Sequence, residues 1–192
     1  MDKSVDFSPG FCICAALALL ILPLRWILAW GAASALHELG HYLALKICGV
    51  QVLRISVSGG GAVMTTEAMS PGREVICAVA GPVVSLGLSL LLDWMPLVAL
   101  CGFVQGFFNL IPVMPFDGGR AVGSLLELWI PDRKARVMEW LERIVCFLIL
   151  ALGIWSCVLL KMGAGAVLAC VFLFQKVHPI KIPCKPAGKG VQ

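Results

Sequence analysis

Long apolar segments constrain the fold of this chain more than any other feature. A transmembrane helix needs about 20 mostly apolar residues, and six candidate segments can be drawn, at roughly 7–23, 26–47, 73–93, 95–111, 141–160 and 162–177. Hydrophobic residues make up 60% of the 192-residue chain and charged residues 14%. Soluble domains are about half apolar and about a quarter charged. We therefore predict an all-α polytopic membrane protein with about six transmembrane helices.

The first two apolar segments are predicted to form a hairpin of two helices. A single helix over 7–47 would be far longer than the ~30 Å hydrocarbon core at ~1.5 Å per residue. Pro23 and Arg25 supply a break and a charge near its middle. A cleaved signal peptide is the alternative, but Asp2 and Asp6 outnumber the single lysine of that leader, which is the wrong charge balance.

The distribution of positive charge predicts the orientation. With six spans, 13 of the 15 lysines and arginines fall on one side, and only Arg25 and Lys161 fall on the other. The positive-inside rule places the first side, with both termini, in the cytoplasm. The net charge of +4 suits contact with the anionic headgroups of a lipid bilayer. No basic stripe with interleaved aromatic residues predicts a nucleic-acid partner.

The second apolar segment contains His37-Glu38-Leu39-Gly40-His41. The two histidines stand at i and i+4 on one helix face, where two imidazoles can bind one Zn²⁺. Glu38 lies beside the first histidine, in the position of a general base. Ionisable residues are costly at membrane depth and usually mark a functional site. Three of them within five residues need a common partner, and a divalent cation is the simplest one.

A catalytic zinc takes three protein ligands and keeps one position open. Four residues are candidates for the third ligand: His178, Glu67, Asp93 and Asp117. His178 ends the last apolar segment, Asp93 lies on the non-cytoplasmic side, and Glu67 in a polar loop is an outside possibility. Asp117 is better placed. Two prolines and two glycines break the fourth segment at 109–119, which brings this carboxylate to the depth of the histidines, about 10 Å below the surface.

Two motifs resemble those of the site-2 protease family of intramembrane zinc metalloproteases. They are H-E-L-G-H at 37–41 and N-L-I-P-V-M-P-F-D-G at 109–118. Within the family, the chain is most similar to the branch of stage IV sporulation protein FB, over roughly residues 26–120. A third element, Gly81-Pro82, resembles a family G-P-x-x-N motif, with Ser85 in place of Asn. We interpret Gly81-Pro82 as a kink or a close helix crossing.

The resemblance implies a role for each site residue. His37, His41 and Asp117 would be the ligands of one catalytic Zn²⁺, and Glu38 would be the catalytic base. Asn109 would hydrogen-bond the substrate backbone or stabilise the developing oxyanion. The alternative for Asn109 is a polar cap on the broken helix.

Residues 50–66 predict a β-hairpin directly after the metal-binding helix. Apolar and polar residues alternate over 52–58, a Gly-Gly-Gly turn follows at 59–61, and a second alternating run ends at Thr66. The family has a small membrane-associated sheet in this position. An edge strand there could pair with an unwound substrate, or the hairpin could be a simple connection.

The sequence therefore predicts one integral membrane metalloprotease domain over 1–178, with its active site towards the cytoplasm, and a disordered cytoplasmic tail over 179–192. The expected reaction is hydrolysis of a peptide bond in a membrane-tethered protein within or near the bilayer. A pro-sigma or anti-sigma factor is the expected kind of substrate, and inhibitory membrane partners are compatible with it. The alternatives are a zinc or proton transporter that uses the same metal site and a catalytically silent membrane adaptor.

Overall fold

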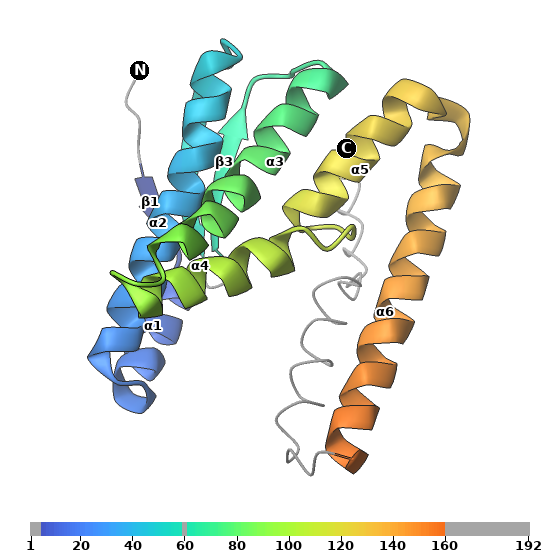
Figure 1. Cartoon of the computed structure of the whole chain (residues 1–192). Helices are drawn as coiled ribbons and strands as arrows, with labels where there is room; N and C mark the ends of the chain where they lie inside the picture. Colours follow the sequence, from blue (N-terminus) through green and yellow to red (C-terminus); the bar gives the residue numbers. More distant parts are fainter. Residues whose placement is uncertain (1–4, 59–60, 160–192) are drawn as a thin grey trace, which may run out of the picture. The chain divides into compact units, whose positions relative to one another are not determined.

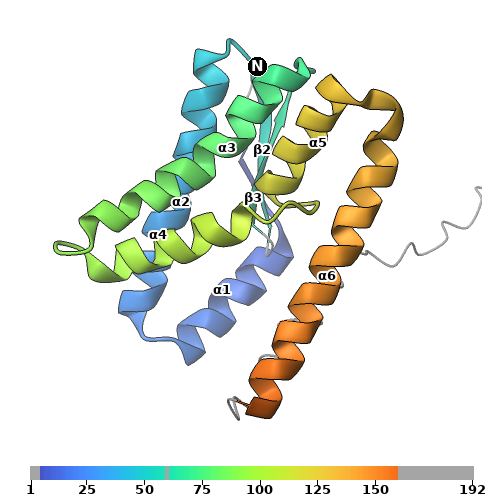
Figure 2. The same cartoon turned by 45° about the vertical axis from the view of Figure 1, so that its right-hand side comes forward.

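The computed structural model describes residues 5–58 and 61–159 of the chain (Figures 1 and 2). The chain divides into two compact units, one up to Leu141 and one from Glu142 onwards. The first unit contains the three predicted metal ligands, His37, His41 and Asp117. The predicted span at 162–177 and the predicted tail at 179–192 lie outside the described residues.

The predicted hairpin of two helices is confirmed. Helix α1 spans Pro9–Ile21 and helix α2 spans Leu24–Ile47. The Oγ of Ser8 accepts a hydrogen bond from the backbone N–H of Phe11 at the start of α1 (3.3 Å). Leu22 then takes an extended conformation, as expected for a residue that precedes proline. The chain therefore leaves one helix and begins the next at Pro23.

A three-stranded sheet follows the order β1-β2-β3. Strands β2 (Val52–Ser58) and β3 (Gly61–Thr66) are antiparallel, which confirms the predicted hairpin. Strand β1 (Val5–Phe7) was not predicted, and it pairs in parallel with the other edge of β2. Arg54 on β2 donates a hydrogen bond to Asp6 on β1 (Nε–Oδ2 2.6 Å). The structure thus has the mostly helical fold with a small β-hairpin that the sequence predicts, and β1 adds a third strand to it.

Helices α2, α3 and α4 pack against one another (Figure 1). Helix α3 spans Pro71–Gly87 and continues as a 3-10 turn, η1, over Leu88–Leu91, while α4 spans Pro96–Asn109. The buried side of α2 carries small residues that let neighbouring backbones approach: Ala29, Ala33, Gly40 and Ala44. A Cβ at Gly40 would lie only 2.9 Å from the carbonyl oxygen of Ala80. This contact brings the histidine-bearing turn of α2 directly against α3.

One helix in the first unit was missed by the sequence analysis. Helix α5 spans Asp117–Trp129 and packs on α3 (Figure 2). A short 3-10 turn, η2, over Pro131–Arg133 leads into α6, which spans Lys134–Leu159. The broken segment before Asp117 therefore joins two helices, and the predicted third ligand is the first residue of the second one.

In the part of the chain that the structure describes, one helical stretch is long and apolar enough to cross a membrane, Pro71–Leu91, with a mean hydropathy of 2.0. Pro9–Ile21 and Pro96–Asn109 are apolar but shorter. The predicted number of six spans stays a prediction. Large apolar side chains point outwards in the first unit, with Leu20 83%, Leu90 86% and Trp94 87% exposed. Extensive exposed apolar surface is typical of a protein that contacts lipid.

Candidate metal centre

Helix α2 holds two buried histidines one turn apart. His37 and His41 lie on its buried side, and their Nε2 atoms are 3.1 Å apart. The spacing of four residues places both imidazoles on the same helix face. The geometry predicted from this spacing is confirmed, with both ring Nε2 atoms turned to one point.

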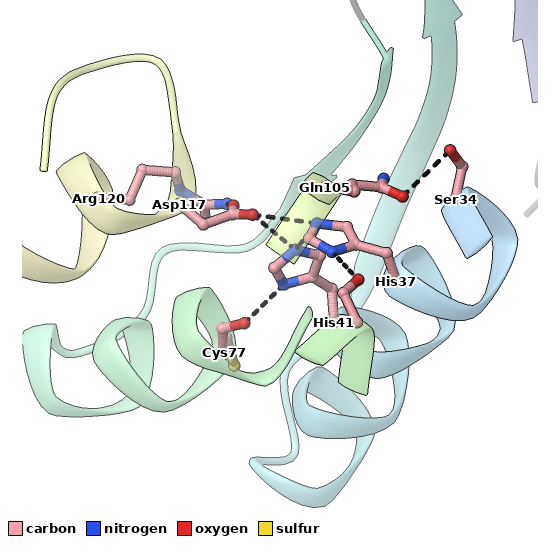
Figure 3. Close-up of polar contacts among 8 residues, drawn as sticks. Ser34, His37, His41, Cys77, Gln105, Asp117 and Arg120 are labelled. Carbon is pink, nitrogen blue, oxygen red and sulfur yellow. Dashed lines mark hydrogen bonds and ion pairs between the residues drawn. The ribbon is translucent and has the colours of Figure 1, made fainter. Parts of the chain in front are cut away.

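Asp117 reaches the same point from a distant part of the chain (Figure 3). Its Oδ2 lies 3.2 Å from Nε2 of His37 and 3.1 Å from Nε2 of His41. The three residues each offer one ligand atom, and these atoms lie within 4.8 Å of one another. Two imidazole nitrogens and one carboxylate oxygen are the number and kind of protein ligands typical of a catalytic zinc site. The three side chains can therefore hold a metal ion.

The irregular segment 110–116 places Asp117 by folding back onto the first turn of α5. A Cβ at Gly118 would lie 2.2 Å from the carbonyl oxygen of Leu110, and one at Gly119 would lie 2.3 Å from the carbonyl carbon of Val113. Side chains at these two positions would collide with backbone, which cannot move aside as a flexible side chain can. The glycines after Asp117 therefore permit the tight turn that carries this ligand to the histidines.

Each imidazole is also bound through its second nitrogen. Nδ1 of His41 donates a hydrogen bond to the backbone carbonyl of Cys77 (2.7 Å), and Nδ1 of His37 lies 2.8 Å from Oγ of Ser85. Both partners belong to α3. Ser85 stands where the resembling motif has Asn, and it still supplies a polar contact.

Gly81 lies against the ring of His41. A Cβ at Gly81 would be 2.2 Å from Nε2 of His41. The close helix approach predicted for Gly81-Pro82 is present, and the group that occupies the space beside Gly81 is the imidazole of His41. Any side chain at this position would collide with the ring of His41.

Arg120 contacts the outer oxygen of Asp117. Its Nη1 lies 3.6 Å from Oδ1 of Asp117, and its Nε lies 3.7 Å from Oε1 of Glu74 on α3. Arg120 and Glu74 are each more than a third exposed, so solvent screens both ion pairs. Sequence reasoning missed this pair, because nothing in the local pattern brings position 74 near position 120.

The other candidate site residues differ in where the structure places them. Glu38 is partly buried and interacts electrostatically with both histidines and with Asp117. Asn109 is the last residue of α4 and is partly exposed. Among the described residues, Glu67 and Asp93 are not members of the ligand cluster. His178 lies outside the part of the chain that the structure describes.

A side-chain hydrogen bond joins α2 to α4 one turn away from His37. Oγ of Ser34 donates a hydrogen bond to Oε1 of Gln105 (3.4 Å; Figure 3). Ser34 lies one turn before His37 on α2, and Gln105 lies one turn before Asn109 on α4. The sequence analysis passed over both residues. Their presence inside strongly apolar segments was the signal that could have found them.

Comparison with known proteins agrees with this geometry. Residues 91–152 match the model of peptidase family M50. A zinc metalloprotease of Methanocaldococcus jannaschii is 34% identical over 106 residues, which are 48% of this chain and 31% of that protein. Stage IV sporulation protein FB of Bacillus subtilis is 27% identical over 184 residues, 88% of this chain and 63% of that protein. The chain thus spans less than two thirds of the length of either relative.

The fold also matches a solved structure. The site-2 protease from Methanocaldococcus jannaschii superimposes with a TM-score of 0.65 at 20% sequence identity, and the match covers 100% of this chain and 98% of that one. This likeness shows that the two chains share a fold. The chain is thus similar to peptidase family M50 over residues 91–152, to zinc metalloproteases and a sporulation protein in sequence, and to a site-2 protease in fold.

Proposed function

We propose that this chain is an intramembrane zinc metalloprotease that hydrolyses a peptide bond of a membrane-tethered protein within or near the bilayer. The observation that carries the proposal is the meeting of His37, His41 and Asp117 at one point, across 80 residues of sequence. The names of two relatives, a zinc metalloprotease and a sporulation protein, support the proposal of a zinc metalloprotease.

The donor set fits zinc better than the other common divalent ions. Mg²⁺ and Ca²⁺ prefer oxygen ligands, whereas two imidazole nitrogens and one carboxylate suit Zn²⁺. His37, His41 and Asp117 would hold one catalytic ion. When bound, zinc supplies Lewis acidity for the hydrolysis.

Glu38 is the proposed general base. It follows His37 directly on α2 and is partly buried. In the proposed reaction its carboxylate takes a proton from the attacking water and then gives a proton to the leaving amine of the cut peptide.

Asn109 is the proposed partner of the substrate. It ends α4 immediately before the broken segment that leads to Asp117. Its carboxamide would donate a hydrogen bond to the substrate backbone or to the developing oxyanion. The alternative role for Asn109 is a polar cap on the end of α4.

The sheet supplies a surface for an extended substrate. Within the described residues, β1 and β3 flank β2, so the outer edges of the sheet belong to β1 and β3. We propose that a locally unwound substrate segment adds to the β3 edge, since an exposed edge presents unpaired backbone groups to an extended peptide. The hairpin would otherwise be a connection between α2 and α3 without a substrate role.

The proposed topology is one membrane domain over 1–178 with about six spans, cytoplasmic termini and a site towards the cytoplasm. The charge distribution supports this orientation. A pro-sigma or anti-sigma factor is the proposed kind of substrate, and the resemblance to the sporulation branch supports it.

The test compares the wild-type chain with Glu38→Gln in the membranes of its own host. Glu38→Gln removes the proton-accepting charge and leaves all three metal ligands in place. We expect this variant to retain stoichiometric zinc and to lose proteolysis, so that a membrane-tethered protein accumulates uncut in comparative membrane proteomics. Unchanged cleavage by Glu38→Gln would refute the role of Glu38. Zinc flux into proteoliposomes without any cleavage would instead favour a transporter.

A further inference from the structure

One face of α3 is shaped around the two histidines of α2. Cys77, Gly81 and Ser85 recur every four residues, so they form a stripe along a single side of the helix. The carbonyl of Cys77 binds His41, the absent side chain of Gly81 leaves room for the same ring, and the hydroxyl of Ser85 contacts His37. Both Nδ1 contacts therefore come from one rigid element.

The two contacts differ in what they require of the imidazole. A carbonyl oxygen can only accept, so Nδ1 of His41 must carry a hydrogen and Nε2 is left with its lone pair. A hydroxyl can donate or accept. The contact of 2.8 Å between Ser85 and His37 is therefore compatible with either tautomer of the ring. A metal ion needs the lone pair of Nε2, and in that state Nδ1–H of His37 donates to Ser85.

Ser85 is enclosed on the side away from His37. Its side chain is fully buried, at 0% exposure, and His37 is buried as well, at 3%. On α4, a Cβ at Gly106 would lie 3.0 Å from Cβ of Ser85, and one at Gly102 would lie 2.9 Å from the backbone oxygen of Ser85. Helix α4 thus packs directly against this residue, and the contact between its hydroxyl and the imidazole is buried.

We propose that Ser85 is a positioning residue that holds His37 in the orientation and tautomer that present Nε2 to the metal. This inference rests on the proposed function, because it takes the three-ligand site to be a zinc site. Partners of the second ring nitrogen orient metal-bound histidines in many proteins. Without the hydroxyl, Nδ1 of His37 would lose this partner on α3, and the ring could turn or change tautomer.

The test measures zinc affinity in the purified full-length chain by competition with a chromophoric chelator. Ser85→Ala removes the hydroxyl and leaves a good helix former. We expect it to weaken zinc binding by about 10–100-fold, the usual effect of losing such a partner. Ser124→Ala is the matched control, because Ser124 is a similarly buried serine on α5 and is not a partner of either histidine. We expect this control to bind zinc as the wild type does.

A second measurement separates positioning from a general loss of packing. Co²⁺ replaces zinc in the same variants, and its visible absorption reports the arrangement of the ligands. We expect the spectrum to change in Ser85→Ala and to stay unchanged in Ser124→Ala, with equal helix content by circular dichroism. Wild-type affinity and a wild-type Co²⁺ spectrum in Ser85→Ala would overturn the inference and leave the proposed function intact. A wild-type chain that binds no zinc would overturn both.

Discussion

Two segments of the molecule, here called arms, bring the proposed metal ligands to the same point in different ways. Helix α2 is regular from Leu24 to Ile47 and carries two ligands one turn apart. The other arm is the irregular segment 110–116, which ends at the single ligand Asp117. On the regular arm the helix itself sets the distance between ligands. On the irregular arm the position of the ligand depends on how the segment folds back, so the two arms should respond differently to substitution.

The two arms also differ in the contacts that keep them in position. The regular arm packs against another helix, because α2 and α3 approach closely at Gly40 and Gly81. The irregular arm packs against its own continuation, because Gly118 and Gly119 lie against the backbone of the segment that precedes them. A defect in α3 should therefore displace ligand rings, whereas a defect at the glycines of α5 should disrupt the backbone that carries Asp117.

Removal of one ligand from each arm should give the largest effects. His41→Ala leaves one ligand on each arm, and we expect stoichiometric zinc to be lost. Asp117→Ala leaves the preorganised pair on α2, and we expect weak binding that a chelator removes easily. Metal analysis of the purified proteins, followed by chelator titration, distinguishes the two variants. Equal zinc affinity in both variants would contradict the claim that α2 preorganises its ligands.

Added methyl groups test how each arm is supported. Gly118→Ala meets backbone at 2.2 Å, so we expect it to lower the free energy of unfolding by about 1–3 kcal/mol or more. Gly81→Ala meets the ring of His41, and we expect zinc affinity to fall more than stability does. Gly72→Ala is the control, since nothing lies within 4 Å of its Cβ position. Denaturant unfolding and zinc titration measure both quantities, and a greater loss of stability in Gly81→Ala would reverse the assignment.

Asn109→Ala tests the junction between α4 and the irregular arm. If Asn109 binds the substrate oxyanion, kcat should fall by about 10²–10³-fold while zinc content stays at the wild-type level. If Asn109 only caps α4, the arm that carries Asp117 should loosen and zinc affinity should fall with activity. Steady-state cleavage and metal analysis on the same preparation decide between these roles.

Arg120→Gln should give the smallest effect. The ion pairs of Arg120 with Asp117 and Glu74 are 3.6 and 3.7 Å long and partly exposed, and such pairs contribute about 0–1 kcal/mol. We expect a slight loss of stability that disappears at high salt, because salt screens exposed charges. Denaturant unfolding at low and high ionic strength measures this difference. A large loss at both ionic strengths would show that Arg120 supports the irregular arm more strongly than its exposure suggests.

Much of the site could be predicted from the sequence, because local rules govern it. The spacing of His37 and His41 fixes their shared face once the segment is helical, and Pro23 fixes the break between α1 and α2. Alternating residues and a glycine turn predicted β2 and β3. The prolines and glycines at 112–119 predicted a broken helix, although the helix that follows it, α5, was missed.

The sequence by itself determined which residues can bind a metal, where α2 begins, and which segments are apolar, since each of these depends on neighbours along the chain. The tertiary structure decided that β1 pairs with β2, that Ser85 and Cys77 bind the histidines, and that Arg120 reaches Glu74. Those contacts join residues 36 to 50 positions apart, and helix packing rather than spacing along the chain brings them together.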